Sequence, residues 1–329
     1  GLRYQGMQRN PGADTIEERL LDALAQAQLV SQDNAGSLQK IGFGRAGRTD
    51  KGVHACAQVV SAKLVAPDDG RSPEAMETLH RLNSFLPDDI RVFGYRRVTN
   101  GFQPKKHASR REYEYLIPSF AMRPPEEPGH ESPSEESLRE YRVSKNLLER
   151  MQDTLQVFVG THRFHNFTSK MSPLDVKSRR FIVSFDVVDT MELGCMQYVR
   201  LRVVGASFLL NQIRKMIAGA LMVVRGHITE DQLRKALDPT RLVSVPMAPG
   251  LGLMLDAVDY SFYHANLEGQ KGTGNRRDQL LWTEEQEVIQ SFKREVILPS
   301  LAAEEEKEHI TFQWLQDLEK VGVPGFLTS

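Results

Sequence analysis

The stretch GFGRAGRTDKGVHA, residues Gly42 to Ala55, has two interpretations that imply different folds. Gly42, Gly44 and Gly47 match the G-x-G-x-x-G pattern of a dinucleotide-binding turn. That turn needs a buried strand before the glycines and a helix after them, because the helix N-terminus faces the pyrophosphate. Here the polar SLQK precedes the glycines and the β-rich AQVVSAKLV follows the loop, so the sequence disfavours a cofactor turn.

The same stretch also presents one aspartate, Asp50, among glycines and cations. Glycines on both sides of it permit tight turns and the close approach of a bulky substrate. Arg45, Arg48 and Lys51 surround the carboxylate, where they would favour its ionised form and attract phosphates. From this loop alone, an ordinary aspartate in a charged turn is the competing interpretation.

Composition is that of an ordinary globular protein with room for two domains. The chain has 329 residues, of which 40% are apolar and 26% charged. No apolar run approaches the ~20 residues that span a bilayer, and the first ten residues lack a signal-peptide pattern. The two cysteines, Cys56 and Cys195, lie far apart in the sequence, which suggests neither a disulfide framework nor a zinc cluster and favours a reducing compartment.

The charge is unevenly distributed along the chain. Residues 121–140 carry −4 and residues 281–329 carry −6, so a net charge of −1 leaves +9 on the remainder. A basic body with acidic segments is typical of an anion-binding protein, although uneven charge also occurs without such a role.

Hydrophobic periodicity and capping signals predict alternating helices and strands in two loosely similar α/β sandwiches. Together with the resemblance described below, they predict an α+β fold. A capping box at Thr15 and the dipeptide Ser72-Pro73 each begin a helix, the second with Met76, Leu79, Leu82 and Leu86 directed inward. Further helices are predicted at 142–158, at 206–225, from Thr229 and after 276, with strands at 57–65, 90–98, 111–118, 181–190, 197–204 and 251–258. Residues 119–140 read as an exposed connection and 262–275 as a linker.

Several blocks, in one order over residues 1–260, resemble the TruA-type pseudouridine synthases. GRAGRTDKGVHA is similar to the family's G-R-T-D-x-G-V-H core, which contains the catalytic aspartate. YQGMQRN (4–10), SRREYEYLIP (109–118), GTHRFHNFTSK (160–170), FLLNQIRKMIAG (208–219) and APGLGLMLDAV (248–258) resemble other family blocks. The sequences GMQRN, HNFTS and NQIRKMI, together with the helical tail, resemble the eukaryotic multisite tRNA members more than the bacterial members of the family. Ser109 and Asn211 depart from the usual Ala and His, and the family's first strand would lie upstream of Gly1.

The resemblance implies two ferredoxin-like (RRM-like) halves that form a mixed, mainly antiparallel sheet around a central basic cleft. The expected parts are residues 1–105 with the catalytic loop, residues 106–261 with the tyrosine strand and the arginine helix, and residues 262–329 as a helical extension.

The implied reaction is the isomerisation of specific uridines to pseudouridine in tRNA, with a flipped base and Asp50 as nucleophile. Attack on the sugar C1′, attack on the base and proton abstraction to a glycal all stay open. We expect no metal or redox cofactor, because the reaction leaves the oxidation level unchanged.

Two further catalytic residues follow from the resemblance. Arg214, on a largely apolar helix stripe with Leu210, Ile213 and Ile217, would pair with Asp50, since a buried guanidinium needs a partner. Tyr113 would stack on the flipped uracil or assist proton removal from its carbon 5, whereas Tyr115 reads as a core residue.

The predicted substrate contacts cluster in the same blocks. Leu251 would pack on the other face of the base, Arg48 would lie near the flipped nucleotide, and His54 would meet RNA or fix the loop. Lys215 would contact a phosphate or be solvated, while His162 and His165 fit structural or RNA-facing roles better than metal ligation. Contacts to phosphates are expected from Arg45 and Lys51 of the Asp50 loop, and from Arg110 and Arg111 of the basic run 105–111. A second basic run at 163–180 is expected to contribute as well.

The expected partner is tRNA, with messenger and small nuclear RNA as alternatives, and no membrane. A monomer is expected because the helical tail would cover the surface through which bacterial relatives dimerise, with a homodimer as the alternative. Family analogy implies the nucleus, then the mitochondrion or cytoplasm. A catalytically silent RNA-binding protein of the same fold is the competing function, and a Rossmann oxidoreductase is a distant third.

Overall fold

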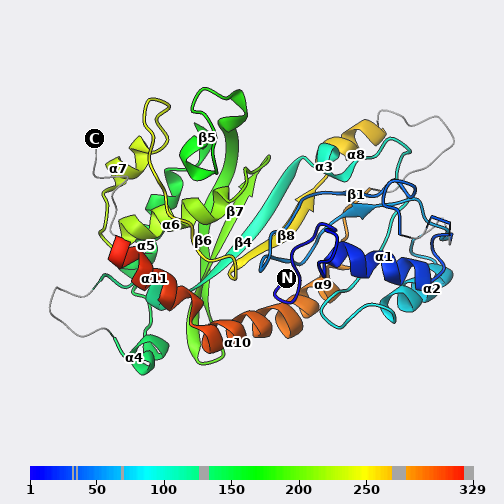
Figure 1. Cartoon of the computed structure of the whole chain (residues 1–329), viewed down its shortest axis with the longest axis horizontal. Helices are drawn as coiled ribbons and strands as arrows, with labels where there is room; N and C mark the ends of the chain where they lie inside the picture. The colour runs from blue at the N-terminus through cyan, green and yellow to red at the C-terminus, as the bar shows by residue number, and fades with distance from the viewer. Residues whose placement is uncertain (32, 35, 68–69, 126–132, 269–278, 322–329) are drawn as a thin grey trace. The chain divides into compact units, whose positions relative to one another are not determined.

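The structure is a computed structural model that describes residues 1–31, 33–34, 36–67, 70–125, 133–268 and 279–321 (Figure 1). The chain divides into two compact units. Unit 1 comprises Gly1–Arg111 with Leu255–Ile297, and unit 2 comprises Glu112–Met254 with Leu298–Ser329. The predicted ranges 1–105, 106–261 and 262–329 stay a prediction.

Unit 1 contains short strands and mostly short helices. Its elements are α1 (Ile16–Gln26), β1 (Gly44–Arg45), β2 (His54–Ala55), β3 (Val60–Ser61), α2 (Pro73–Asn83), α3 (Pro104–His107), α8 (Ser261–Glu268), α9 (Gln286–Phe292) and the π-helical η4 (Lys293–Ile297). Two strands carry the chain between the units, β4 (Arg110–Pro118) and β8 (Leu253–Asp259).

Unit 2 holds the long strands. Its further elements are the 3-10 turns η1 (Ser119–Met122), η2 (His165–Phe167) and η3 (Val176–Ser178), the strands β5 (Gly160–Arg163), β6 (Arg179–Leu193) and β7 (Met196–Gly205), and the helices α4 (Glu135–Glu140), α5 (Lys145–Gln156), α6 (Gln212–Val224), α7 (Glu230–Lys235), α10 (Leu298–Glu308) and α11 (Ile310–Val321).

The strands form a mixed six-stranded sheet of order β2-β8-β4-β7-β6-β5, and β1 pairs with β3 in a separate two-stranded sheet. Within unit 2, β5, β6 and β7 are antiparallel, with registers such as Ile182↔Gly205 and Leu193↔Met196. The expected α+β class and the C-terminal helices are therefore confirmed.

The helix-start signals are correct where a capping side chain carries them. Thr15 caps α1 by accepting a hydrogen bond from Glu18 N, and Ser72 caps α2 by accepting one from Ala75 N. Thr229 forms a full capping box with Gln232 at α7. The predicted inward face of α2 is wrong at one position, because the helix buries Ala75, Thr78 and Leu82 and leaves Met76 exposed.

Two predicted strands of unit 1 are wrong in extent. The stretch 57–65 is a strand only at Val60–Ser61, and 90–98 contains none. At Val92 the side chain of Asn83 replaces a neighbouring strand, since its amide donates to Val92 O (2.8 Å) and accepts from Val92 N (2.9 Å). The main-chain N–H and C=O of Val92 are thus satisfied without a neighbouring strand.

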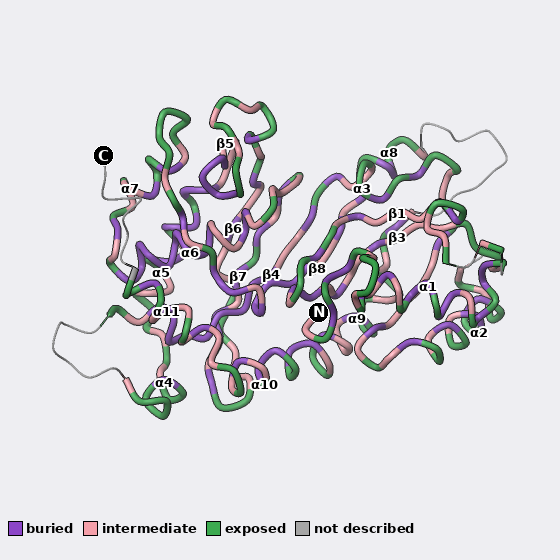
Figure 2. The backbone as a smooth tube through the Cα atoms, in the orientation of Figure 1, coloured by how far each residue is buried: buried purple, intermediate pink, exposed green. Residues whose placement is uncertain are grey.

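Helix α6 is the buried axis of unit 2 (Figure 2). Eleven of its thirteen residues are buried, and the two others are Arg214 and Lys215 in its first turn. The predicted start at 206 is wrong because Asn211 adopts a left-handed conformation (φ +62°), so the helix begins at Gln212. Leu210 consequently lies outside the helix and is exposed, not part of its apolar stripe.

Both segments predicted as connections contain structure. Ser119–Met122 is a buried turn, because the guanidinium of Arg225 donates to the carbonyl oxygens of Ala121 and Arg123. The linker prediction at 262–275 is wrong for α8, while residues 269–278 lie outside the described chain. In the part of the chain that the structure describes, no helix is both long and apolar enough to cross a membrane.

Candidate active site

The Asp50 loop of unit 1 connects β1 to β2 without regular structure. Arg48, Asp50 and Lys51 are exposed, whereas Thr49 between them is buried. Thr49 O accepts from Met7 N (3.0 Å), and Val53 N donates to Asp50 O (3.1 Å) to close a tight turn. The loop therefore presents the Asp50 carboxylate to solvent from an anchored backbone.

The N-terminal block packs directly against this loop. A Cβ on Gly6 would lie 2.8 Å from Thr49 O, so only glycine permits the approach of residues 4–10 to the loop. The fully buried carboxylate of Glu17 accepts from Arg9 N (2.8 Å) and forms an ion pair with Arg45. Arg45 thus has a partner inside the unit, and its predicted contact with RNA stays a prediction.

A second anchor of the loop is the buried guanidinium of Arg111. Its Nη2 donates to Ala46 O and to Lys105 O, both at 2.9 Å. The side-chain amide of Gln58 exchanges two hydrogen bonds with the backbone of Gly47. Arg111 therefore fixes the loop and joins it to α3, and its predicted phosphate contact is untested.

His54 ends the loop and is buried at 4% exposure. Burial lowers its pKa from 6.5 to about 3, so the imidazole is neutral at physiological pH. This position agrees with the expectation that His54 fixes the loop, and its contact with RNA is not tested.

In unit 2, the segment 248–252 lies against β4. The hydroxyl of Tyr115 donates to Pro249 O (2.8 Å), and Leu116 N donates to Gly252 O (2.9 Å). A Cβ on Gly252 would lie 2.1 Å from Leu116 O, so this close approach requires glycine. Leu251 is buried within this segment, and Tyr115 is a core residue as predicted.

Arg214 is held to the same segment. Its Nε donates to Ala248 O (2.7 Å), and Ala248 N donates to Arg214 O (3.2 Å). The side chain is half-buried in the first turn of α6, where the helix dipole disfavours a cation. The dipole of α6 therefore does not stabilise this arginine, and its bond to Ala248 O holds it to the segment 248–252.

Tyr113 is half-buried on β4 and packs edge-to-face against Phe208, with ring centroids 5.3 Å apart. Phe208 in turn lies over Gly205, where a Cβ would come within 2.7 Å of its ring. No sequence signal identified Phe208 as a neighbour of Tyr113, because the residues are 95 positions apart.

Three residues of the 160–170 and 208–219 blocks have structural partners. Lys215 Nζ donates to Asn166 O (3.3 Å) and Thr168 O (3.2 Å), and burial lowers its pKa, while its contact with a phosphate stays a prediction. His162 bonds to Val159 O and His165 to Arg241 O, in agreement with structural roles.

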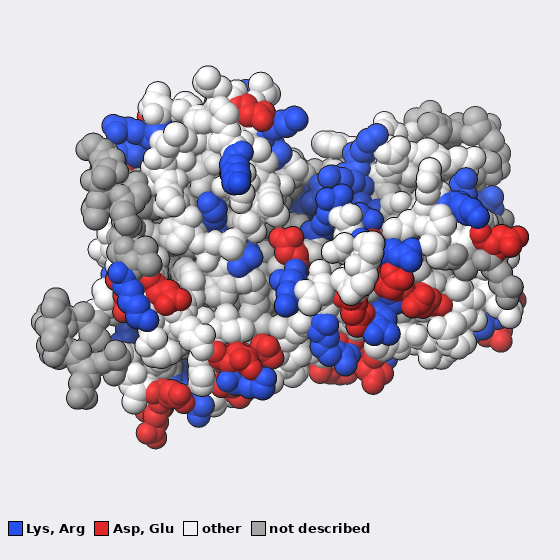
Figure 3. Space-filling model, in the orientation of Figure 1, with Lys and Arg blue, Asp and Glu red and all other residues white. Residues whose placement is uncertain are grey.

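Exposed cations lie beside the Asp50 loop within unit 1. Lys105, Lys106 and Arg110 are exposed at α3 and the start of β4, next to the Arg111 anchor. Lys and Arg side chains gather over α3 in Figure 3. This surface suits a polyanionic substrate.

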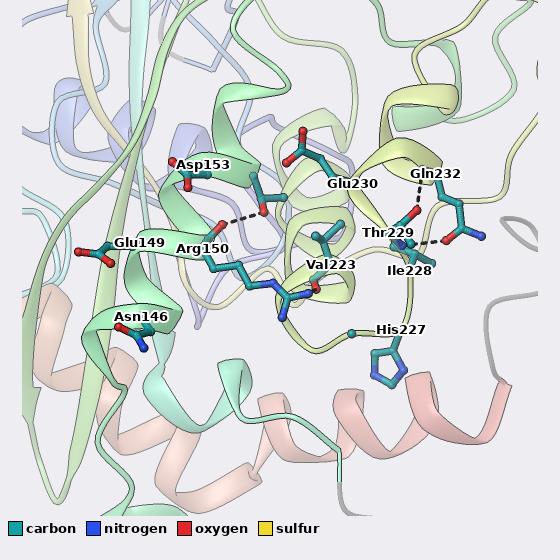
Figure 4. Close-up of a pocket in the computed structure, with 12 residues that line it drawn as sticks. Asn146, Glu149, Arg150, Asp153, Val223, His227, Ile228, Thr229, Glu230 and Gln232 are labelled. Carbon is teal, nitrogen blue, oxygen red and sulfur yellow. Dashed lines mark hydrogen bonds between the residues drawn. The ribbon is translucent and has the colours of Figure 1, made fainter.

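A groove elsewhere in unit 2 lacks the predicted site residues. It encloses about 670 Å³ between α5, the end of α6 and the start of α7 (Figure 4). Its lining carries Glu149, Asp153 and Glu230 against Arg150, whose Nη2 donates to Val223 O (2.6 Å). An acidic groove disfavours nucleic acid, so we do not assign it to the substrate.

An exposed carboxylate on an anchored loop with exposed cations beside it fits a negatively charged substrate. Comparison with known proteins is more specific, since residues 155–261 match the family described as tRNA pseudouridine synthase. The chain is 35% identical to the Mus musculus protein "Pseudouridylate synthase 1 homolog", over 97% of this chain and 71% of that protein. The Homo sapiens protein of the same name is also 35% identical, over 97% and 70%.

A fungal relative extends the comparison. The "tRNA pseudouridine synthase 1" of Candida albicans is 29% identical over 95% of this chain and 63% of that protein. The chain belongs to the tRNA pseudouridine synthase family, and the resemblance carried by the sequence motifs is confirmed.

The buried, neutral His54 predicts a pH-dependent stability. The unfolded chain binds a proton below pH 6.5, whereas the folded chain does so only near pH 3, so stability falls as pH decreases through this window. Between about pH 7.5 and 5.0 the loss from this group is about 2 kcal/mol. Urea unfolding at both pH values should show this loss in the wild type and a correspondingly smaller loss in His54→Gln. Equal losses in the two proteins would show that His54 is not held neutral.

Proposed function

We propose that this protein converts specific uridines of tRNA to pseudouridine. The observation that carries the proposal is the exposed Asp50 carboxylate, within the family's aspartate motif, on a loop anchored by Met7, Gln58 and Arg111. A loop of this kind places one acidic group at a fixed position without burying it. Such preorganisation favours catalysis over a purely structural role.

The reaction exchanges one bond to the sugar for another. The bond between C1′ and N1 of the uracil breaks, the base turns, and a bond between C1′ and C5 forms. The proton on C5 is released and N1 gains a proton, so atoms and oxidation level balance. Asp50 acts as the nucleophile in this proposal, at the C1′ or at the base.

Tyr113 and Leu251 are proposed to hold the uracil while it turns. Tyr113 is half-buried and its ring orientation is set by Phe208, which leaves part of the ring accessible for stacking. Leu251 lies in the segment that Tyr115 and Gly252 fix against β4. An aromatic ring and an aliphatic side chain can pack on the two faces of a flipped base without forming hydrogen bonds that its rotation would break.

Arg214 is proposed to stabilise the negative charge of Asp50, as the family resemblance implies. Two hydrogen bonds to Ala248 fix its backbone and the Nε atom of its guanidinium. The N-terminus of α6 adds a partial positive charge at the same place. Arg48, Lys51 and Arg110 are proposed phosphate contacts because they are exposed.

The finer features of the family are also proposals for this chain. They are the two ferredoxin-like halves, the central basic cleft, a monomeric state and a nuclear location. The substrate proposal is tRNA, with messenger and small nuclear RNA as alternatives to be compared in the same assay. The exposed cations of unit 1 support an RNA substrate of any of these kinds.

The direct test measures tritium release from tRNA labelled at carbon 5 of uridine, because formation of the C1′–C5 bond expels that proton. The wild type should release tritium, and Asp50→Asn should release none while its affinity for tRNA stays within about threefold, since binding is spread over many phosphates. Glu18→Gln, which neutralises another carboxylate of unit 1, is the matched control and should stay active. Turnover by pure Asp50→Asn would remove Asp50 from the nucleophile role, and a silent wild type would favour an RNA-binding protein.

Arg214 variants test the second catalytic assignment. Arg214→Leu should lower the turnover rate at least a hundredfold, which corresponds to a loss of transition-state stabilisation of about 2.7 kcal/mol or more. Arg214→Lys should have an intermediate rate, because it keeps the charge without the planar guanidinium. Single-turnover rates at saturating enzyme measure this, with thermal unfolding as the control for folding. A folded Leu variant with normal rates would show that Arg214 does not act on the reacting groups.

A further inference from the structure

Residues 163–168 of unit 2 hold three separate loops, and these residues are called the anchor segment here. Arg163 donates to Pro173 O (2.7 Å), and Phe164 N donates to Ser178 O (2.9 Å), which ties down the loop 169–178. The hydroxyl of Thr168 donates to Leu210 O (2.9 Å), which ties down the loop 206–211.

The third loop, 236–248, is held by His165 and Asn166. His165 Nε2 bonds to Arg241 O (2.8 Å), and Asn166 bonds to the carbonyl oxygens of Ala236 and Arg241 and to Val243 N. His165, Asn166 and Thr168 are all buried, so their side chains hold the loops 206–211 and 236–248 from the interior of the unit.

These fixed loops carry large apolar side chains into solvent. Leu174 is 81% exposed, and Val176 and Leu242 are each 77% exposed. Leu210 and Met247 are exposed as well. The three loops together have fewer than thirty residues, yet they hold five of the fourteen exposed large hydrophobic residues of the described chain. Single exposed hydrophobic residues need no explanation, but a group on loops bound to one segment indicates a contact surface.

The surface also carries cations. Residues 169–180 contain Lys170, Lys177, Arg179 and Arg180 against the single carboxylate of Asp175, which accepts from Lys177 N. In the third loop Arg241 is exposed, and Asp238 accepts from the backbone and hydroxyl of Thr240. The carboxylates are thus engaged by their own turns, and the guanidinium of Arg180 donates to Lys177 O and Arg179 O. The exposed cations favour a negatively charged partner; they are Lys170, Lys177, Arg179 and Arg241.

The surface is continuous with the Arg214 part of the site within unit 2. Met247 precedes Ala248, the residue bonded twice to Arg214. Leu210 precedes Asn211, the residue before the start of α6, and Phe208 of the same loop contacts the ring of Tyr113. In Figure 1 the loops near β5 and between α7 and β8 both extend beyond the sheet of unit 2.

We propose that this loop surface binds RNA beside the target uridine and keeps it open. Leu174, Val176 and Leu242 pack against the faces of bases that separate when the uridine flips, and the cations of residues 170–180 bind the adjoining phosphates. Flipping costs the stacking and pairing energy of the target base, a few kcal/mol in a duplex. Apolar side chains placed between base steps offset that cost, as in other proteins that unstack nucleic acid.

The inference rests on the proposed function, because it names how the same enzyme gains access to its uridine. Its consequence is a dependence on RNA structure. Removing the apolar side chains should slow the reaction where the target uridine must be unpaired first, and should matter little where it is already unpaired.

The test uses the full chain with Leu174→Ser/Leu242→Ser and two RNA hairpins that differ only in whether the target uridine is paired. We expect kcat/KM to fall about tenfold or more on the paired target and to stay within about threefold on the unpaired one. Val65→Ser, an equally exposed apolar position of unit 1, is the matched control and should behave as wild type on both hairpins. Both variants should keep wild-type thermal stability, because exposed positions contribute little to folding.

A readout without turnover separates this inference from the proposed function. 2-Aminopurine beside the target uridine should brighten when Asp50→Asn binds, and much less when the Leu174→Ser/Leu242→Ser changes are added. An increase in 2-aminopurine fluorescence without pseudouridine formation by the wild type would refute the proposed function and support RNA binding by the loop surface. Equal kcat/KM values for wild type and double variant on both hairpins would refute the surface and keep the function. A wild-type dimer that the double variant converts to monomer would show that the patch is an interface between copies, and would also overturn the proposal.

Discussion

Buried polar side chains that satisfy the backbone of irregular segments are the constraint on which both parts of the candidate site depend. The Asp50 loop has no helix or strand between β1 and β2, so its carbonyl and amide groups need other partners. Arg111 and Gln58 supply them at Ala46 and Gly47. In unit 2, Tyr115 serves the segment 248–252 in the same way. The residues proposed to face substrate are thus held in place by other side chains, which bond to the backbone around them.

This arrangement also explains why the predicted RNA-binding cations divide into two groups. Arg45, Arg111 and Lys215 bond to a buried carboxylate or to backbone carbonyls, whereas Arg48 and Lys51 are exposed beside Asp50. The first group sets geometry, and the second is available to phosphates. A basic sequence motif around a catalytic residue therefore combines scaffold and substrate contacts, and its total charge overstates the number of phosphates that it can bind.

The sequence correctly predicts those elements whose signals lie within a few neighbouring residues. The caps at Thr15, Ser72 and Thr229 and the strand β4 depend on residues within a few positions of one another. The errors arise where a distant partner decides. Asn83 takes the place of a strand at Val92, the left-handed Asn211 delays the start of α6, and Arg225 buries the turn at Ala121. The resemblance proposes Asp50, Tyr113 and Arg214 as site residues. It does not predict the anchoring role of Arg111, because the sequence cannot show whether a cation binds a phosphate or a carbonyl oxygen.

The central claim is that interior hydrogen bonds of unit 1, rather than RNA, fix the position of Asp50. Arg111→Met removes the bonds to Ala46 O and Lys105 O, and its most direct test is hydrogen exchange of the amides of residues 46–54 without RNA, measured together with tritium release. The account predicts that these amides exchange at least about tenfold faster than in the wild type, as expected when a local opening costs 1.4 kcal/mol less, and that turnover falls while tRNA affinity is kept. A folded Arg111→Met protein with unchanged loop protection and unchanged turnover would contradict it.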